Sequence, residues 1–539
     1  MKLIHVISDF RSGSCKSISR SFRTMVIYGV FILLMIITIT QKENYHLDET
    51  ASYGLSNNVG STTIRFDDGI KYEVDDIFKQ YLAVDKLERF NYQNVWENQK
   101  KDVHPPLYYA ILHTICSLFP EIFSTWFAAS INIVFAILNL FFLRKICYNL
   151  TSDSTISFVI SVAFVFSSGI LNTVSFYRMY VMAMFWVTVL AYVVLEAIDK
   201  KIKNRKLYIC LFAITTLGAL THYYCIVFDV FISLIFGIYL LSQKDYRQTI
   251  TFSAVQGMAG LISYIIFPSM VGHMFSGYRG TEAMDNLHNL KDYVPRLKSF
   301  FSFIDKQMFG GFLGYILCGI IMGGLVIYLL GLKRSETCTA ESKNLKNIFA
   351  VKYSIIFLPV IMYFLAVSKM AAYKIDRYVF PVYTLIFTGI LCLLFDTAKS
   401  FFGKKSMAVI ISVVLSLTIV GSFQNASWSY LYRNTAAFLK IAKDYSDCNC
   451  LCLYDNRFKI QPMYKEALNY DSITFMNYDK MEYLGNLEIA KDDKLLVAII
   501  GKDNKDDYIK EVMSFYKQYS NYKTLGSYSY GTTYFLYSE

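Results

Sequence analysis

The chain has 539 residues, of which 54% are hydrophobic and only 18% are charged, whereas soluble proteins carry about 25% charged residues. Its formal net charge of +11 comes from Lys and Arg that lie mainly between long apolar runs. This placement argues against a nucleic-acid-binding protein and is typical of the positive-inside rule of membrane proteins. The composition therefore predicts a polytopic α-helical membrane protein with no nucleic-acid partner.

Eleven apolar runs follow one another along the chain, each near the roughly 17–25 residues that a membrane-spanning helix needs. They cover residues 24–40, 123–143, 155–171, 179–198, 207–222, 223–241, 250–271, 311–332, 348–367, 378–396 and 406–424. The first run follows five basic residues and has no small-residue cleavage site after it. We therefore expect a retained signal anchor in a cell membrane, with the N-terminus in the cytoplasm.

The connections between the runs sort into two sets by charge. Lys and Arg cluster after residues 143, 199, 243, 332 and 398, and we expect these connections in the cytoplasm. The other set, which we expect outside, comprises residues 41–122, 172–178, 272–310 and 368–377. Leu107–Phe119 is apolar but short, and counting it as a span would invert every later connection. It is therefore expected to be a helix in the first outer loop, at the membrane surface.

The composition changes after residue 424. Residues 425–539 alternate expected strands (449–454, 494–500 and 522–537) with expected helices (435–444 and 506–520). This pattern predicts a small extracytoplasmic α/β domain that follows a transmembrane domain of residues 1–424. The domain contains no dinucleotide fingerprint, phosphate loop or zinc-ligand spacing, and Cys448, Cys450 and Cys452 have no second ligand group nearby.

Two acidic residues, Asp48 and Glu49, lie just beyond the first apolar run. They could be a solvated loop start that provides the N-cap of the helix that follows. They could equally supply a carboxylate at the membrane surface that accepts a proton from an acceptor hydroxyl.

Further polar residues gather at the expected outer ends of the runs. His104-Pro-Pro-Leu-Tyr108-Tyr109 opens the short helix, and its prolines fix a helix start, while His104 and Tyr108 could contact a phosphate or sugar. Arg178, with Tyr180 after it, could extend its side chain to the interface or bind a lipid-linked phosphate. The remaining candidates are His222 and Tyr223 in a tight turn, and Lys369, Lys374 and Arg377, which run against the positive-inside trend and suggest an anionic partner.

In order along the chain, Asp48-Glu49, the His-Pro-Pro-Leu-Tyr-Tyr hexamer, Arg178-x-Tyr180, Thr221-His222-Tyr223 and Arg377-Tyr378-x-x-Pro381 resemble motifs of the GT-C membrane glycosyltransferases. The similarity covers about residues 20–425. It is greatest to family 39, the dolichyl-phosphate-mannose-protein mannosyltransferase-like group that includes the aminoarabinose transferases of lipid A.

This resemblance implies a GT-C fold and an inverting sugar transfer, at the outer face, from a polyprenyl-phosphate carrier to an acceptor that could be a protein, a lipid or a cell-wall glycan. It places Asp48 at the family's outer-loop acidic residue and Arg377 at its phosphate-binding arginine. Glu49, His104, Tyr108, Arg178, Tyr180, His222, Tyr223 and Lys374 are the expected substrate contacts. No cofactor is expected, and no essential divalent metal, because Asp48 and Glu49 offer too few ligands.

Two other functions remain open at this point. A flippase or transporter for lipid-linked glycans would need ionisable residues near the bilayer midplane, of which Asp229 is the main one. A polysaccharide polymerase or ligase could use the loop at 272–310, which carries His273, Arg279 and Arg296.

Overall fold

The computed structural model describes residues 22–200, 205–289, 291–333, 340–425, 427–487, 494–528 and 530–538. Contacts divide the chain into two compact units. The helical unit comprises residues 1–38, 130–175 and 179–428, and the α/β unit comprises residues 39–129, 176–178 and 429–539. The α/β unit thus combines the C-terminal segment with the first loop of the chain. Four of the five basic residues ahead of the first helix lie outside the described residues.

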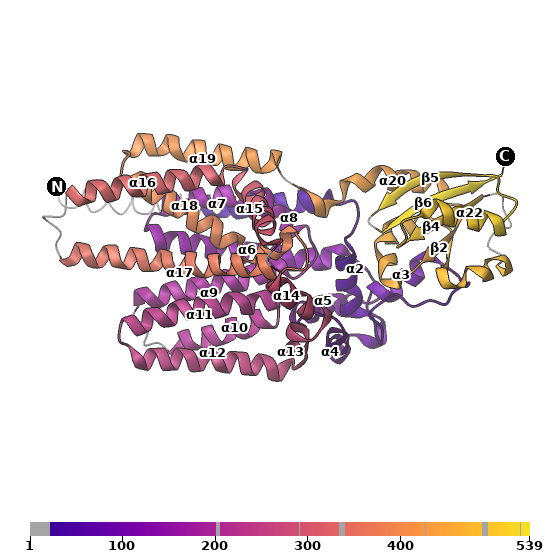
Figure 1. Ribbon diagram of the computed structural model, residues 1–539, viewed down its shortest axis with the longest axis horizontal. Helices are drawn as coiled ribbons and strands as arrows, with labels where there is room; N and C mark the ends of the chain where they lie inside the picture. Colours follow the sequence, from indigo (N-terminus) through magenta and orange to yellow (C-terminus); the bar gives the residue numbers. More distant parts are fainter. Residues whose placement is uncertain are drawn as a thin grey trace, which may run out of the picture. The chain divides into compact units, whose positions relative to one another are not determined.

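Helices long and apolar enough to cross a membrane dominate the helical unit, where they run side by side (Figure 1). Eight qualify among the described residues: Phe22–Thr40, α6 (Thr125–Thr151), α9 (Tyr180–Lys200), α11 (Tyr223–Ser242), α12 (Tyr246–Ile266), α17 (Ala340–Met370), the segment Phe380–Lys399 that contains α18 (Tyr383–Lys399), and α19 (Lys404–Gln424). The chain is a multi-pass membrane protein, as its composition predicted.

Two bent pairs of helices raise this number to ten if each pair is one span. Helix α7 (Ser154–Val165) meets α8 (Ser168–Val174) at 56°, and α15 (Tyr293–Phe309) meets α16 (Leu313–Lys333) at 87°. The second bend falls at Gly310 and Gly311, whose φ angles of 68° and 90° suit glycine because it lacks a Cβ. The expected crossing at 207–222 corresponds to α10 (Arg205–Ala219), which has only 15 residues.

Short helices complete the helical unit in the expected loop regions. Residues 269–309 form α13 (Ser269–Phe275), α14 (Tyr278–His288) and α15, and the connection before α18 forms the 3-10 turns η3 (Asp376–Tyr378) and η4 (Phe380–Val382). The segment that the sequence placed in a loop at 272–310 is therefore largely helical, whereas residues 371–375 form a non-helical connection between α17 and η3.

The α/β unit is built on a six-stranded mixed sheet of order β1-β3-β2-β4-β6-β5. Its centre is parallel and consists of β2 (Asn449–Tyr454), flanked by β3 (Ser472–Asn477) and β4 (Lys494–Ile500). The hairpin of β5 (Asn521–Tyr528) and β6 (Gly531–Tyr537) adds to β4. Strands β2 and β4 confirm two of the expected strands, whereas the single strand expected at 522–537 is this hairpin and β3 was not predicted.

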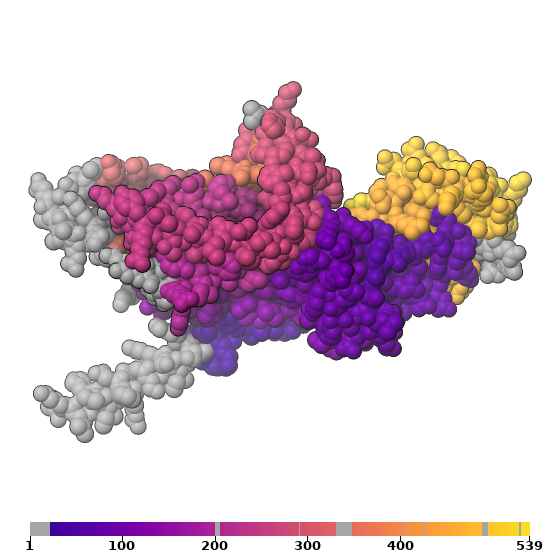
Figure 2. All heavy atoms as spheres, turned by 90° about the horizontal axis from the view of Figure 1, so that it is seen from below, coloured from indigo at the N-terminus to yellow at the C-terminus, as the bar shows by residue number. Residues whose placement is uncertain are grey.

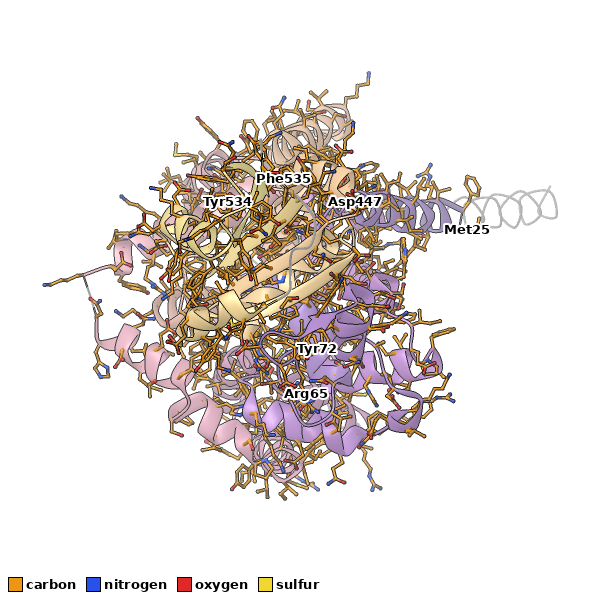
Figure 3. All side chains as sticks on the ribbon, turned by 90° about the vertical axis from the view of Figure 1, so that its right-hand side faces the viewer. Met25, Arg65, Tyr72, Asp447, Tyr534 and Phe535 are labelled. Atoms are coloured by element: carbon orange, nitrogen blue, oxygen red, sulfur yellow. The ribbon has the colours of Figure 1, made fainter. Side chains whose placement is uncertain are left out.

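The other edge of the sheet is supplied by the first loop of the chain. Strand β1 (Lys71–Tyr72) pairs antiparallel with β3, with Tyr72 opposite Ile473. Figure 3 shows Tyr72 and Arg65 on one side of the strands and Tyr534 and Phe535 of β6 on the other. In Figure 2 the violet surface of the loop lies against the yellow and orange surface of the C-terminal segment. The pairing explains why contacts join these two distant segments in one unit.

The rest of the α/β unit is helical. The first loop forms α2 (Leu47–Asn57), α3 (Val74–Leu82), η1 (Lys86–Glu88), α4 (Tyr92–Lys101) and α5 (Leu107–Leu118). The C-terminal segment forms η5 (Ser429–Leu431), η6 (Arg433–Thr435), α20 (Ala436–Ala442), η7 (Lys443–Tyr445), η8 (Arg457–Met463), α21 (Tyr464–Ala467), η9 (Tyr478–Asn486) and α22 (Lys505–Phe515). Helix α5 confirms the expected short helix, which is too short to cross a membrane.

Both faces of the central strands β2 and β4 are buried. Leu451, Leu453, Val497 and Ile499 pack with α22 and η9 in one apolar core. Cys450 and Cys452 are fully buried between β3 and β4, where burial raises the pKa of each thiol well above its usual value. They act there as small apolar core residues.

Glu466, in α21, is buried beside this sheet. Its Oε1 accepts hydrogen bonds from Tyr470 at 2.7 Å and from Thr533 of β6, and its Oε2 has no partner among the described residues. Burial raises the pKa of its carboxyl to about 7, although the two hydrogen bonds to Oε1 act to lower that pKa. The folded protein therefore holds Glu466 protonated over much of the acidic range.

We expect the α/β unit to lose stability as pH rises from about 4.5 to about 7, because in that window only the folded state retains the Glu466 proton. The neutral amide of Glu466→Gln removes this dependence. Thiol labelling of Cys450 and Cys452, resolved by peptide mass spectrometry, measures opening of β2. The ratio of wild-type to variant labelling rates should rise about tenfold or more between pH 4.5 and 8.

The control is Glu482→Gln, because Glu482 is exposed in the same unit. Its labelling rate should follow that of the wild type at every pH. A constant ratio for Glu466→Gln across the range would contradict the expectation.

Candidate active site

Helix α2 begins directly after the first membrane helix, and its first turn is a capping box. The N-cap residue His46 accepts a hydrogen bond from Asp48 N through Nδ1 at 3.0 Å, and Glu49 Oε2 accepts one from His46 N at 2.6 Å. The two carboxylates therefore lie at the positive end of the helix and complement its dipole, while the His46 ring and the Glu49 carboxylate each satisfy one free backbone N–H group. A helix does begin here, as expected, but its N-cap is His46, and Asp48 and Glu49 lie in the first turn instead of at the N-cap position.

Glu49 forms a buried ion pair with Lys42. The two side chains are 2% and 0% exposed, and Lys42 Nζ lies 2.9 Å from Glu49 Oε1. The same oxygen accepts a hydrogen bond from Tyr177 N at 2.8 Å, and Lys42 donates to the carbonyl of Tyr430. Burial lowers the pKa of Lys42 and raises that of Glu49, while their mutual attraction opposes both shifts. These contacts give Glu49 a structural part, and substrate contact by Glu49 stays a prediction.

Arg178 follows Tyr177 and is 3% exposed. Its Nη1 donates to three acceptors: the carbonyl of Asp48 at 3.1 Å, Ser52 Oγ at 2.9 Å and Tyr109 Oη at 3.0 Å. Because the ion pair holds the backbone at Tyr177, the guanidinium is fixed beside the first turn of α2. A fixed cation of this kind can stabilise negative charge without rearranging first.

His104 links Arg178 to Asp102. Its Nδ1 lies 2.7 Å from Asp102 Oδ2, and its Nε2 lies 3.2 Å from Arg178 Nη2. The arrangement assigns the proton to Nδ1, which donates to Asp102, so that Nε2 accepts from Arg178. Burial lowers the pKa of His104 against the opposing effect of Asp102. Burial raises the pKa of Asp102, but His104 and Arg178 outweigh it and hold that pKa below its usual value.

The side chain of Asp48 is 23% exposed, in contrast to its buried neighbour Glu49. One of its oxygens lies 3.6 Å from His46 Nδ1, but that nitrogen already accepts from Asp48 N and therefore carries no proton. The contact is thus not an ion pair. Among the expected site residues, Asp48, Arg178 and His104 come together in the α/β unit, together with Tyr108, whose ring lies 5.9 Å from that of Tyr109.

The other expected residues lie in the helical unit. The ring of Tyr180, at the start of α9, is 5.2 Å from that of His222, the N-cap of α11. Tyr223 Oη hydrogen-bonds to His273 Nδ1 at 2.8 Å. The rings of Tyr180 and His222 are thus neighbours, and Tyr223 contacts a residue of the short helix α13. Substrate contact by these three residues stays a prediction.

The basic residues near 370 have different surroundings. Lys374 forms an exposed ion pair with Asp292 at 2.9 Å, Lys369 donates to the carbonyl of Asn289, and the Arg377 guanidinium lies 5.7 Å from the ring centre of Tyr378. The sequence suggested an anionic partner for these cations, and for Lys374 this partner is Asp292 of the same chain. An anionic substrate at Arg377 stays a prediction.

Sequence reasoning missed three members of the cluster. Lys42, Asp102 and Tyr109 were not singled out, although Asp102 precedes His104 by two residues and Tyr109 ends the hexamer. The sequence did contain a signal for Asp102, because it is an acidic residue two positions before His104, which precedes a helix start. Within the described part of the chain, His, Cys, Asp and Glu do not gather in groups of three that could hold a metal ion, and a lack of metal dependence stays a prediction.

Comparisons with known proteins give a structural likeness only. No family model matches the sequence, and no curated protein matches it. The structure is similar to crystal structures of ArnT from Cupriavidus metallidurans, in one bound to undecaprenyl phosphate (TM-score 0.54, 9% identity, 95% of this chain and 97% of that chain) and in one in the apo state (TM-score 0.52, 9% identity, 96% and 98%). It is less similar to the archaeal oligosaccharyltransferase AglB from Archaeoglobus fulgidus (TM-score 0.42, 9% identity, 94% and 74%). The chain has the fold of ArnT over nearly its whole length, which confirms the expected GT-C membrane fold.

We expect Glu49→Gln to destabilise the protein strongly, by about 3–5 kcal/mol, because it leaves the buried Lys42 ammonium without a counter-charge. The double variant Lys42→Met/Glu49→Leu should recover more than half of the loss, since it buries no unpaired charge. Thermal unfolding of the purified protein in detergent measures both effects. Glu97→Gln, which breaks only an exposed pair with Lys100, is the matched control, and equal losses for Glu49→Gln and Glu97→Gln would contradict the expectation.

Proposed function

We propose that the protein is a glycosyltransferase that transfers a sugar from a polyprenyl-phosphate carrier to an acceptor hydroxyl at the outer face of the membrane. The observation that carries the proposal is the contact between Asp48 and Arg178. A partly exposed carboxylate and a fixed guanidinium share one site, because Arg178 Nη1 binds the carbonyl of Asp48 itself. Sugar transfer from a phosphate needs both a proton acceptor and a stabiliser of anionic charge.

The identity of the carrier is inferred from the fold. ArnT was crystallised with undecaprenyl phosphate, and this chain has the same fold over nearly all of its length. A long apolar carrier is also compatible with a protein whose helices offer many exposed Leu, Ile and Val side chains to lipid. Polyprenyl phosphate is therefore the donor class that we assign to this chain, with membrane lipids as its surroundings.

The chemistry follows from the two groups. Asp48 accepts the proton of the acceptor hydroxyl, and the oxygen attacks the anomeric carbon from the face opposite the phosphate. The bond between the anomeric carbon and the phosphate oxygen breaks, and the polyprenyl phosphate leaves with the electron pair. Attack from the opposite face inverts the anomeric configuration. Base catalysis of this kind is worth about 10²–10⁴-fold.

Arg178 stabilises the charge that develops on the departing phosphate. Its hydrogen bonds to Ser52 and Tyr109 hold the guanidinium in a fixed position for this role. Neutral His104 orients Nη2 and adds no charge of its own. Tyr180, His222, Tyr223, Lys374 and Arg377 belong to the helical unit, and their contact with the substrate stays a prediction from the sequence.

The topology is part of the proposal. The N-terminus lies in the cytoplasm, and the α/β unit lies outside the membrane, where it meets the acceptor. The positive-inside distribution of Lys and Arg in the sequence supports this orientation. No divalent metal enters the proposed chemistry.

The function is tested by transfer from a polyprenyl-phosphate sugar with the purified protein in lipid nanodiscs. Asp48→Asn should lower kcat by about 10²–10⁴-fold, because the amide cannot accept the proton, and should leave binding of radiolabelled polyprenyl phosphate unchanged. Arg178→Gln should lower kcat by about 10²-fold or more, because the charge on the leaving phosphate loses its stabiliser.

The matched control is Asp85→Asn, which replaces an exposed carboxylate of the same unit and should retain activity. Full activity in both Asp48→Asn and Arg178→Gln would refute the mechanism. Movement of the lipid-linked sugar across the bilayer without any glycoside product would point instead to a flippase.

A further inference from the structure

A cavity lies within the α/β unit, and its described lining does not include Asp48 or Arg178. It has a volume of 410 Å³, within the range of about 300–1,000 Å³ that is typical of small-molecule sites. Four segments build its wall: residues 44–45 after the first helix, residues 429–435, η8 and β5. All four belong to the same compact unit.

The wall carries polar groups and aromatic rings but no charge. It includes Asn44, Tyr45, Ser429, Tyr432, Asn434 and Ser527, and none of its described members is acidic or basic. Two ammonium groups lie near its rings, Lys42 at 5.3 Å from the ring centre of Tyr432 and Lys465 at 4.9 Å from that of Tyr45. Lys42 is paired with Glu49, and Lys465 donates to the carbonyl of Lys42, so the described lining itself offers a charged ligand no charged partner. Amides, hydroxyls and aromatic faces match the hydroxyls and C–H faces of a neutral sugar.

Asn44 is the polar anchor of the cavity. It is 4% exposed, and its Oδ1 accepts a hydrogen bond from Tyr45 N at 2.9 Å. Its side-chain NH₂ group has no hydrogen-bond partner among the described residues. A buried amide that keeps two free donors at a cavity wall loses free energy unless a ligand or water accepts from it.

Tyr432 has a backbone conformation that side chains of its size rarely adopt. It lies in the left-handed region, with φ 53° and ψ 34°, and such outliers concentrate at functional sites. Neighbouring contacts hold it there: Lys42 Nζ lies 5.3 Å from its ring centre, and the His46 ring lies 6.5 Å away. Tyr432 is thus one wall of the cavity and at the same time a neighbour of the residue that caps α2.

The cavity therefore connects to the proposed catalytic carboxylate through two residues. The ring centre of Tyr432 lies 6.5 Å from that of His46, and His46 Nδ1 accepts from the backbone of Asp48. Asn44 also follows Thr40, the end of the first membrane helix, by four residues, a chain length that spans at most about 14 Å. The lining of the cavity is thus linked to Asp48 through His46.

We propose that this cavity is the acceptor site, and that the acceptor is a neutral, hydroxyl-rich saccharide. The assignment of the ligand as the acceptor rests on the proposed function, whereas the binding of a neutral saccharide stands on the cavity itself. Asn44 donates to sugar hydroxyls through its NH₂ group, and Tyr45 and Tyr432 contribute ring faces. The uncharged wall selects against acceptors that carry a phosphate or carboxylate at this position, since such groups would be buried without a partner.

Binding is measured first, with the full chain in lipid nanodiscs, because maltoside and glucoside detergents are themselves neutral saccharides. Saturation-transfer NMR with methyl glucoside, methyl galactoside and methyl mannoside should show contact by at least one of them. Methyl glucuronide and glycerol phosphate are the charged probes and should show none. Preferential binding of a charged probe, or of a neutral tetrapeptide, would overturn the proposal.

Variants then locate the binding. Ser527→Trp places an indole at an exposed position of the wall and should abolish the NMR contact, and Asn434→Ala, also at an exposed position, should weaken it several-fold. Asn44→Leu removes the buried donors and should have the same effect as Ser527→Trp. Asn504→Ala, an exposed asparagine whose side chain caps no helix, is the control and should bind like the wild type. Unchanged binding in Ser527→Trp and Asn434→Ala would overturn the proposal even if Asn44→Leu failed to fold.

Transfer kinetics separate this proposal from the proposed function. If the protein transfers sugar, Ser527→Trp should raise the KM for the acceptor about tenfold or more and leave the KM for the polyprenyl-phosphate donor unchanged. If the acceptor KM stays the same, the cavity is not the acceptor site and the glycosyltransferase function still stands. If no transfer occurs at all, the NMR comparison of neutral and charged probes still decides whether the cavity binds a neutral saccharide.

Discussion

The α/β unit depends on one buried ion pair, that of Lys42 with Glu49. Its two charges are almost completely removed from water and lie 2.9 Å apart. Lys42 binds the carbonyl of Tyr430, and Glu49 binds the backbone of His46 and Tyr177. The pair therefore connects the end of the first helix, the start of α2, the three-residue segment that carries Arg178 and the segment that opens the C-terminal part. A buried ion pair contributes little net stability, but the loss of either partner leaves a buried charge unpaired. The pair therefore selects one arrangement of these segments and adds little to the free energy of unfolding.

The sequence was sufficient to predict the features that depend on local composition. Long apolar runs identified the membrane helices, and buried strands such as β2 and β4 were evident from short apolar segments. Features that depend on distant partners were not predicted. Strand β1 has two residues and exists only because it pairs with β3, and the two bent helix pairs follow from backbone geometry that an apolar run does not encode.

The same distinction holds for the site. Asp48, His104 and Arg178 could be selected because charged residues at the ends of apolar segments are costly and therefore informative. Their arrangement could not be predicted, since it depends on hydrogen bonds between segments far apart in the chain, such as Arg178 to Ser52. The two adjacent carboxylates also differ in exposure: the Asp48 side chain is partly exposed, whereas that of Glu49 is fully buried. Spacing alone treats the two carboxylates as equivalent, and only the helix start at His46 separates them.

The position of β1 has a consequence for biosynthesis. Segments separated by 388 residues meet in this unit, as in the contact of Lys42 with Tyr430, so the N-terminal half of the unit is made long before its partners leave the ribosome. Until then the unit carries the Glu49 carboxylate and the Lys42 ammonium group, which only later segments cover, and β1 has no partner strand. Contacts of such large sequence separation form slowly. A chain truncated before β3 would thus expose an incomplete unit, which offers quality-control proteases a direct way to tell unfinished copies from finished ones.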